Sequence, residues 1–209
     1  PTAGGAFIKS HPDKAIPDMQ IHYVSAAMND VHAREGVPKD HGFSSIVYCC
    51  RPQSRGRIGL QDADPQSAPA IFPNYFSVEQ DLIDTRNGFR ETRRVFMQEA
   101  FDEYRGRQLK PSVDVNVDDD AQVDQWIRDT GETLYHPVGT CKMGLDDMAV
   151  VDEQGAVHGM QGLRVIDASI MPTLIGGNTN APTIMMAEKI SDHILGQPAL
   201  PAEDVVTEN

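Results

Sequence analysis

The spacing of apolar residues changes near residue 79, and this change constrains the fold more than any other feature. Before it, Met19–Val24 alternates apolar and polar side chains, as a strand with one buried face does. Further short strands are expected at 43–50, 57–60 and 70–72. From residue 79 to about 104, apolar residues recur every three or four positions, which predicts an amphipathic helix closed by Gly106. Successive strands joined by turns predict an antiparallel sheet beside this helix.

Two more helices and one strand are predicted in the rest of the chain. Residues 121–130 show a short helical pattern, and residues 163–167 form a short apolar strand. A helix at 181–195 is opened by Pro182, which is tolerated in a first turn, and is closed by Gly196. The fold class is therefore α+β: a mainly antiparallel sheet with flanking helices, plus a C-terminal strand–loop–helix. The arginines of the first helix are expected on a solvated face: Arg86, Arg90, Arg93 and Arg94.

The charge and cysteine content exclude several classes of protein. The chain carries 18 Lys and Arg against 31 Asp and Glu, a net charge of −13, which argues against nucleic acid or an anionic membrane as the main partner. No stretch is apolar enough for a transmembrane helix. The 3 cysteines show no metal-ligand spacing and fit a reducing compartment. We expect no metal, and a cytoplasmic protein, at most peripheral to the inner face of a membrane.

Three features could carry chemistry, and each also has a structural interpretation. His136 precedes a proline, Asp167 ends the predicted strand, and residues 178–180 form a polar loop before the last helix. A single histidine is most often structural, Asp167 could merely end a strand, and Asn180 could merely cap the helix. The other histidines have no distinctive spacing and are expected to be structural: His11, His22, His32, His41, His158 and His193.

Taken together, these residues resemble a known family. Three ordered segments carry the resemblance: 136–144 (HPVGTCKMG), 162–172 (GLRVIDASIMP) and 177–189 (GNTNAPTIMMAEK). They are similar to the C-terminal signature of glucose-methanol-choline (GMC) flavoprotein oxidoreductases, nearest to the choline dehydrogenase-like alcohol dehydrogenases. Upstream, residues 51–56 and 62–65 resemble the substrate domain of the same family, so the resemblance covers most of the chain.

The resemblance implies oxidation of a primary alcohol to an aldehyde by hydride transfer to FAD. His136 matches the family's active-site histidine, which takes the hydroxyl proton or stabilises the forming alkoxide. General acid–base catalysis of this kind contributes roughly 10²–10⁴-fold in rate. Asn180 matches the second active-site position, where an amide can donate a hydrogen bond to the substrate oxygen without titrating. The resemblance also implies which residues lie along FAD: Asp167, Ala168, Ala181, Pro182 and Thr183.

The dinucleotide-binding fingerprint G-x-G-x-x-G is missing from the sequence. We therefore expect the chain to be the C-terminal portion of a GMC enzyme, with the N-terminal FAD-binding half and a small alcohol as its partners. Residues 1–135 are expected to form the substrate-binding domain. Residues 136–197 are expected to form the catalytic histidine loop and the return into the FAD-binding domain, with a flexible tail at 198–209. The isolated chain is expected to be inactive, to bind FAD weakly or not at all, and to be prone to self-association.

Three alternatives stay open at this point. The chain could be a non-catalytic protein-interaction module, in which His136 and Asn180 would not need to converge on one cavity. It could belong to a GMC oxidase that uses oxygen, because motifs do not determine the electron acceptor. A metal-dependent hydrolase that uses the acids at 118–120 is the least favoured, because consecutive side chains seldom converge on one ion.

Overall fold

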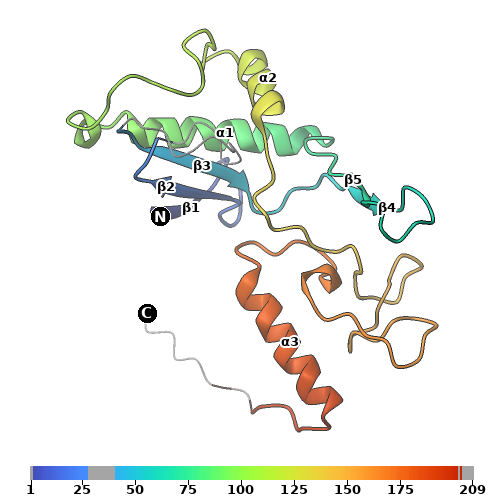
Figure 1. Ribbon diagram of the computed structural model, residues 1–209. Coiled ribbons are helices and arrows are strands. Elements are labelled where there is room, and N and C mark those ends of the chain that lie inside the picture. The colour runs from blue at the N-terminus through green and yellow to red at the C-terminus, as the bar shows by residue number, and fades with distance from the viewer. Residues whose placement is uncertain (1, 28–40, 202, 204–209) are drawn as a thin grey trace. The chain divides into compact units, whose positions relative to one another are not determined.

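The computed structural model describes residues 2–27, 41–201 and 203. The chain divides into two compact units, Pro1–Leu134 and Tyr135–Asn209, which are described separately (Figure 1). His32 lies outside the described residues, as does most of the predicted tail. Within the described ranges, no helix is both long and apolar enough to cross a bilayer, and no cluster of acids, histidines and cysteines is suited to a metal ion.

The first unit contains a three-stranded antiparallel sheet (Figure 1). Its strands are β1 (Thr2–Ile8), β2 (Met19–Val24) and β3 (Ser44–Cys49), with β2 in the middle. The prediction for β2 is confirmed at both ends, and the observed β3 is shorter than the predicted strand 43–50 by one residue at each end. We did not predict β1, because Gly4 and Gly5 are poor strand formers whose side chains contribute no pattern. The strand β1 forms because its backbone pairs with β2, although its own sequence shows no strand pattern.

Helix α1 (Glu79–Phe96) covers one face of this sheet (Figure 1). A Cβ atom at Gly88 would lie 2.7 Å from Met19 Cε and 3.1 Å from Val47 Cγ2, so the glycine permits close packing of helix and sheet. Met19 and Ile21 are fully buried beneath the helix, on the apolar face that the alternation in β2 predicts.

The predicted extension of α1 to about residue 104, with Gly106 as its end, is wrong. The helix stops at Phe96, Gln98 is extended, and a short 3₁₀ helix η1 (Glu99–Phe101) follows. The ring centroids of Phe96 and Phe101 lie 5.4 Å apart, and those of Phe43 and Phe96 4.9 Å apart. This aromatic cluster covers part of Phe101 without a longer helix, because rings packed at such distances are already favourable.

Helix α2 (Asp120–Thr130) packs against α1 and confirms the second predicted helix. The core between them consists of Leu82, Val123 and Ile127, with Trp126 at its border. Asp119 caps α2 by accepting hydrogen bonds from the backbone N–H groups of residues 121 and 122, which have no acceptor within the helix.

The predicted strands at 57–60 and 70–72 form a small hairpin of β4 (Arg57–Gly59) and β5 (Ala70–Phe72). Gly56 precedes it, and a Cβ atom there would lie 2.3 Å from the carbonyl oxygen of Phe72. Only a glycine fits here, because the backbone at residue 56 lies close to the backbone of Phe72. The sequence had predicted a tight turn or bulge at this glycine.

We expected all four arginines of α1 on a solvated face, and this prediction is wrong for two of them. The side chain of Arg86 is only 12% exposed and pairs with Asp124 at 2.6 Å and with Asp120 at 3.1 Å. Arg90 also pairs with Asp120. The carboxylates come from α2, so the sequence of α1 alone could not reveal that two of its arginines face another helix.

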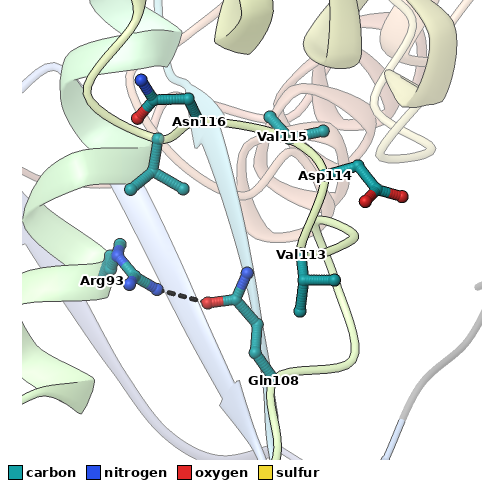
Figure 2. A pocket seen from close by; sticks show the side chains of 7 residues that line it. Arg93, Gln108, Val113, Asp114, Val115 and Asn116 are labelled. Carbon is teal, nitrogen blue, oxygen red and sulfur yellow. Dashed lines mark hydrogen bonds between the residues drawn. The ribbon is translucent and has the colours of Figure 1, made fainter.

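The loop between η1 and α2 runs beside α1 and borders a hollow of about 420 Å³ (Figure 2). The hollow is lined by Arg93 of α1 and by Gln108 and residues 113–117 of the loop, and Figure 2 shows Val113 and Asp114 across from Arg93. Arg93 donates a hydrogen bond from Nη1 to Gln108 Oε1 at 2.5 Å, which joins the helix to the loop.

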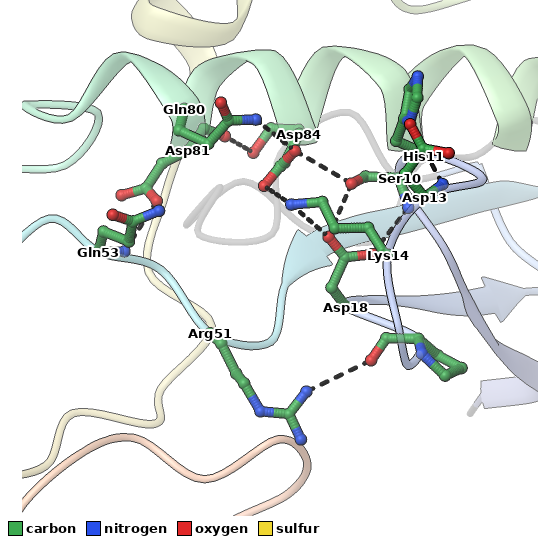
Figure 3. Close-up of polar contacts among 12 residues, drawn as sticks. Ser10, His11, Asp13, Lys14, Asp18, Arg51, Gln53, Gln80, Asp81 and Asp84 are labelled. Atoms are coloured by element: carbon green, nitrogen blue, oxygen red, sulfur yellow. Dashed lines mark hydrogen bonds and ion pairs between the residues drawn. The ribbon is translucent and has the colours of Figure 1, made fainter.

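A buried polar network ties the β1–β2 turn to α1 (Figure 3). Ser10 Oγ lies 2.7 Å from Asp18 Oδ2 and 3.0 Å from Asp84 Oδ1, and Lys14 Nζ lies 2.7 Å from Asp84 Oδ2. Burial alone raises the pKa of Asp18, but hydrogen bonds from Ser10 and the ion pair with Lys14 outweigh it and hold that pKa below its ordinary value. The network therefore favours the charged form of Asp18 and pairs both buried carboxylates with Lys14.

The second unit is built around Val151, Ile170 and Ile190, with a 3₁₀ helix η2 (Ala168–Ile170) and helix α3 (Asn180–Ile194). The predicted bounds of α3 hold to within one residue at each end. Gly196 follows it with φ +68°, the left-handed conformation that ends many helices.

The prediction of a continuous strand at 163–167 is wrong. The segment takes part only in an isolated antiparallel bridge, Ala156 with Arg164. The segments that flank this bridge contain glycines with φ +71° to +75° at positions 155, 159 and 162, and such left-handed residues interrupt a ladder.

Candidate functional site

The loop that carries His136 begins with an unusual backbone conformation. Tyr135 has φ +62°, a left-handed conformation that is uncommon for a bulky residue and is found preferentially at functional sites. The sequence carried no signal for this strain, so Tyr135 was not among the predicted residues. His136 itself is half-buried, and its imidazole forms no hydrogen bond or ion pair within the described part of the chain.

Backbone hydrogen bonds attach the histidine loop to the segment around η2. The N–H of Cys141 donates to Ser169 O at 3.0 Å, and the N–H of Met143 donates to Ile170 O at 2.8 Å. Gly139, with φ +84°, lies so close that a Cβ atom there would be 3.3 Å from Met171 O. Hydrogen bonds thus connect the first two motifs of the predicted signature, 136–144 and 162–172.

Asp167 and Ala168 lie at the start of η2. Asp167 Oδ1 accepts a hydrogen bond from the N–H of Ser169 at 2.7 Å, so one carboxylate oxygen serves as the cap of this short helix. The residue as a whole is exposed, and Ala168 is half-buried. Asp167 therefore caps a short helix and does not end a strand, as its structural interpretation from the sequence had it, and its second carboxylate oxygen is left for another role.

The start of α3 differs in detail from the sequence prediction. The N-cap residue is Thr179, which is 8% exposed, and Asn180 occupies the first helical position, so the interpretation of Asn180 as the cap is wrong. Thr183 donates to Thr179 O from both its N–H, at 3.0 Å, and its hydroxyl, at 2.7 Å. The side chain of Asn180 is exposed and forms no hydrogen bond within the described residues. Asn180 is thus released from capping and presents its amide at the surface of the unit.

A shared core places these segments in one unit. Ile170 of η2 and Ile190 of α3 both pack with Val151, and the histidine loop is bonded to η2. His136, Asp167 and Asn180 therefore belong to one compact body, although they are 44 residues apart at the extremes. Whether the imidazole of His136 and the amide of Asn180 meet over one substrate stays a prediction.

Other candidate groups have structural partners. Asp119 caps α2, and Asp120 pairs with the arginines of α1, so the acids at 118–120 have separate tasks. All three cysteines are free, and burial raises the pKa of Cys49 to about 12. Burial likewise raises the pKa of Cys50, so neither thiol is suited to nucleophilic chemistry near neutral pH. The imidazole Nε2 of His22 lies 2.8 Å from the Tyr48 hydroxyl, as a structural histidine would.

The donor groups at the start of α3 fit an anionic or electron-rich cofactor such as a flavin. The first N–H with an acceptor in the helix is that of Thr183, and Pro182 has no N–H, so the N–H groups of Asn180 and Ala181 remain as two backbone donors at a positive helix end. Ala181 is small and exposed, which leaves room for close approach. These features agree with the residues that the family resemblance assigns to FAD.

Comparison with known proteins establishes the family. The family model described as GMC oxidoreductase matches residues 52–187, and the chain therefore belongs to the GMC oxidoreductases, as their C-terminal domain. Enzymes of this family are FAD-dependent. The resemblance seen in the sequence is thereby confirmed.

Individual relatives within this family are similar to the chain over nearly its whole length. An oxygen-dependent choline dehydrogenase from Pseudomonas aeruginosa is 51% identical over 197 residues, 94% of this chain and 34% of the relative. The protein of the same name from Pseudomonas fluorescens is 49% identical with the same coverage. The crystal structure of pyridoxine 4-oxidase from Mesorbium loti superposes with a TM-score of 0.80 at 25% identity, over 93% of this chain and 38% of that one. The α+β fold class is confirmed, and the chain spans about one third of the length of the curated relatives it matches.

Proposed function

We propose that this chain forms the active-site portion of an FAD-dependent alcohol dehydrogenase that oxidises a primary alcohol to an aldehyde. The observation that carries the proposal is the hydrogen bonding of the histidine loop to residues 169 and 170, within the unit that also holds the start of α3. Membership of the GMC oxidoreductases supports it. The names of the relatives make choline the first alcohol to test.

In this proposal, the imidazole of His136 takes the proton of the substrate hydroxyl, and the side-chain amide of Asn180 donates a hydrogen bond to the same oxygen. When bound, FAD would supply the acceptor for the hydride of the alcohol carbon, which is the two-electron chemistry that the oxidation needs. The residues that would hold it are Asp167, Ala168, Ala181, Pro182 and Thr183. The strained φ of Tyr135 supports a functional role for the adjacent histidine, because such strain persists only where the surrounding structure imposes it.

The test is an alcohol panel on the enzyme that carries this sequence together with an FAD-binding half. We expect His136→Ala to lower turnover by at least about 10²-fold while the flavin stays bound. His193→Ala is the matched control, because His193 is exposed at the far end of α3 and should leave turnover unchanged. Near-normal turnover of His136→Ala would remove this histidine from the reaction. Complete inactivity of the unsubstituted enzyme on every alcohol would favour a non-catalytic interaction module.

The isolated chain is proposed to bind FAD weakly and to be inactive, because the sequence contains no dinucleotide-binding fingerprint. The N-terminal FAD-binding half is then its principal partner, and a stoichiometric flavin spectrum of the purified 209-residue chain would contradict this. The three free cysteines support a cytoplasmic location.

Molecular oxygen is a second candidate for the electron acceptor. Relatives named as oxygen-dependent or as an oxidase favour oxygen, and consumption of oxygen during turnover would distinguish it from an artificial acceptor.

A further inference from the structure

Arg93 differs from the other arginines of α1 in its partners. The other three form ion pairs with carboxylates: Arg86, Arg90 and Arg94. Arg93 has no carboxylate partner within the described part of the chain, although the protein has a net charge of −13 and acids are plentiful. Within the described residues, Arg93 is therefore the arginine of α1 whose partner is a neutral group.

The guanidinium of Arg93 is held in one orientation by a neutral group. Nη1 donates to Gln108 Oε1 at 2.5 Å, and the amide nitrogen of Gln108 donates in turn to Pro111 O at 2.8 Å (Figure 2). Gln108 is therefore fixed by the loop and fixes one edge of Arg93. The other N–H groups of Arg93 have no acceptor among the described residues. A pre-oriented guanidinium with free donors loses little entropy when it binds a ligand.

Arg93 borders the hollow of about 420 Å³ between α1 and the loop. Three valines supply apolar surface around it: Val113, Val115 and Val117. One acid also lines the hollow, but in Figure 2 the carboxylate of Asp114 points away from Arg93, and it accepts a hydrogen bond from Ser112 Oγ at 3.2 Å. The hollow thus combines one cationic group with apolar walls.

We propose that this hollow binds a small monocarboxylate with a compact apolar group. The carboxylate would pair with the free N–H groups of Arg93, whose planar arrangement matches two carboxylate oxygens, and the apolar group would contact the valines. Asp114 and the negative net charge disfavour more highly charged anions such as phosphate. The residues that line the hollow belong to the first unit and include none of residues 136–183, so the inference does not depend on the proposed oxidation.

The test uses isobutyrate as the probe and isobutyramide as its neutral isostere, at constant ionic strength. Binding to the 209-residue chain is followed by the chemical shifts of the backbone amides of Val115 and Val117. We expect saturable binding of isobutyrate with a dissociation constant of about 1 mM, and binding of isobutyramide at least about tenfold weaker. Arg93→Gln should weaken isobutyrate binding by at least about tenfold. Arg94→Gln is the matched control and should leave it unchanged, because Arg94 is exposed and paired with Glu91.

Three results would overturn the proposal. These are the lack of a saturable shift in the unsubstituted chain, equal binding of the two probes, and undiminished isobutyrate binding by Arg93→Gln. If Arg93→Gln does not fold, Arg93→Lys decides the matter, because it keeps the charge and loses the planar fork. Weakened binding of isobutyrate by Arg93→Lys supports the pairing, and unchanged binding overturns it.

Discussion

Replacing Asp81 tests whether the loop at 51–56 depends on α1 for its position. Asp81 is 3% exposed and accepts hydrogen bonds from the N–H of Gln53 at 2.8 Å, the N–H of Ser54 at 2.7 Å and the Ser54 hydroxyl at 2.5 Å. All three converge on one carboxylate in the first turn of α1. Asp81→Ala would leave these donors without their acceptor.

The magnitude follows from the number and type of these bonds. A hydrogen bond to a charged group contributes about 1.5–3 kcal/mol, but Gln53 is exposed, so water can replace part of the loss. We expect Asp81→Ala to lower the free energy of unfolding by about 3 kcal/mol. Asp81→Asn should lose nearly as much, because its amide group turns a donor toward the donors of the loop.

Urea unfolding followed by fluorescence measures this effect. The chain has 1 tryptophan, and Trp126 packs against Phe89 in the core between α1 and α2, with ring centroids 5.1 Å apart. With a slope of about 1–3 kcal/mol per M urea, the midpoint should fall by about 1–3 M. Glu79→Ala is the matched control, because Glu79 is also an acid in the first turn of α1 but is exposed. Equal midpoints for Asp81→Ala and Glu79→Ala would refute the reasoning.

Two further predictions concern pH and backbone conformation. The pKa of Asp18 is held below its ordinary value of 3.8, so its contribution to stability is present above that value and is lost as the pH falls through the lowered folded pKa. Urea midpoints between about pH 5 and pH 2 should therefore fall less steeply in Asp18→Asn than in the unsubstituted chain, and parallel profiles would contradict the ion pair with Lys14. Gly155 and Gly159 share a left-handed φ of +71° and +75°, but only at 155 would a Cβ atom meet a backbone atom, Val165 O at 2.7 Å. Gly155→Ala should therefore reduce the hydrogen-exchange protection of the Val165 amide by much more than Gly159→Ala, and equal protection would exclude this contact as the cause.

Local patterns predicted those elements whose information lies within a few residues. The alternation in Met19–Val24 indicates β2 at its observed bounds, and Gly196 marks the end of α3 to within one residue. The strand β1 was missed because its two glycines contribute no side-chain pattern, and it is ordered by pairing with β2. The end of α1 was misplaced because Phe101, after the helix has already ended, packs against Phe43, which is distant in sequence. In both cases the deciding contacts come from outside the local segment.

For the candidate site, the sequence determined the family and the types of side chain that the site contains. The motifs around His136 and Asn180 are continuous segments, so they can be recognised without the structure. Only the tertiary structure decided that the histidine loop is bonded to residues 169 and 170, and that Thr179 rather than Asn180 caps α3. It also decided that Arg86 pairs with Asp124 while Arg93 borders a hollow. The physical reason is that residues in one helix share the same periodicity, whatever lies opposite them. The partner of each side chain is supplied by segments distant in sequence, and the pattern within one segment contains no information about them.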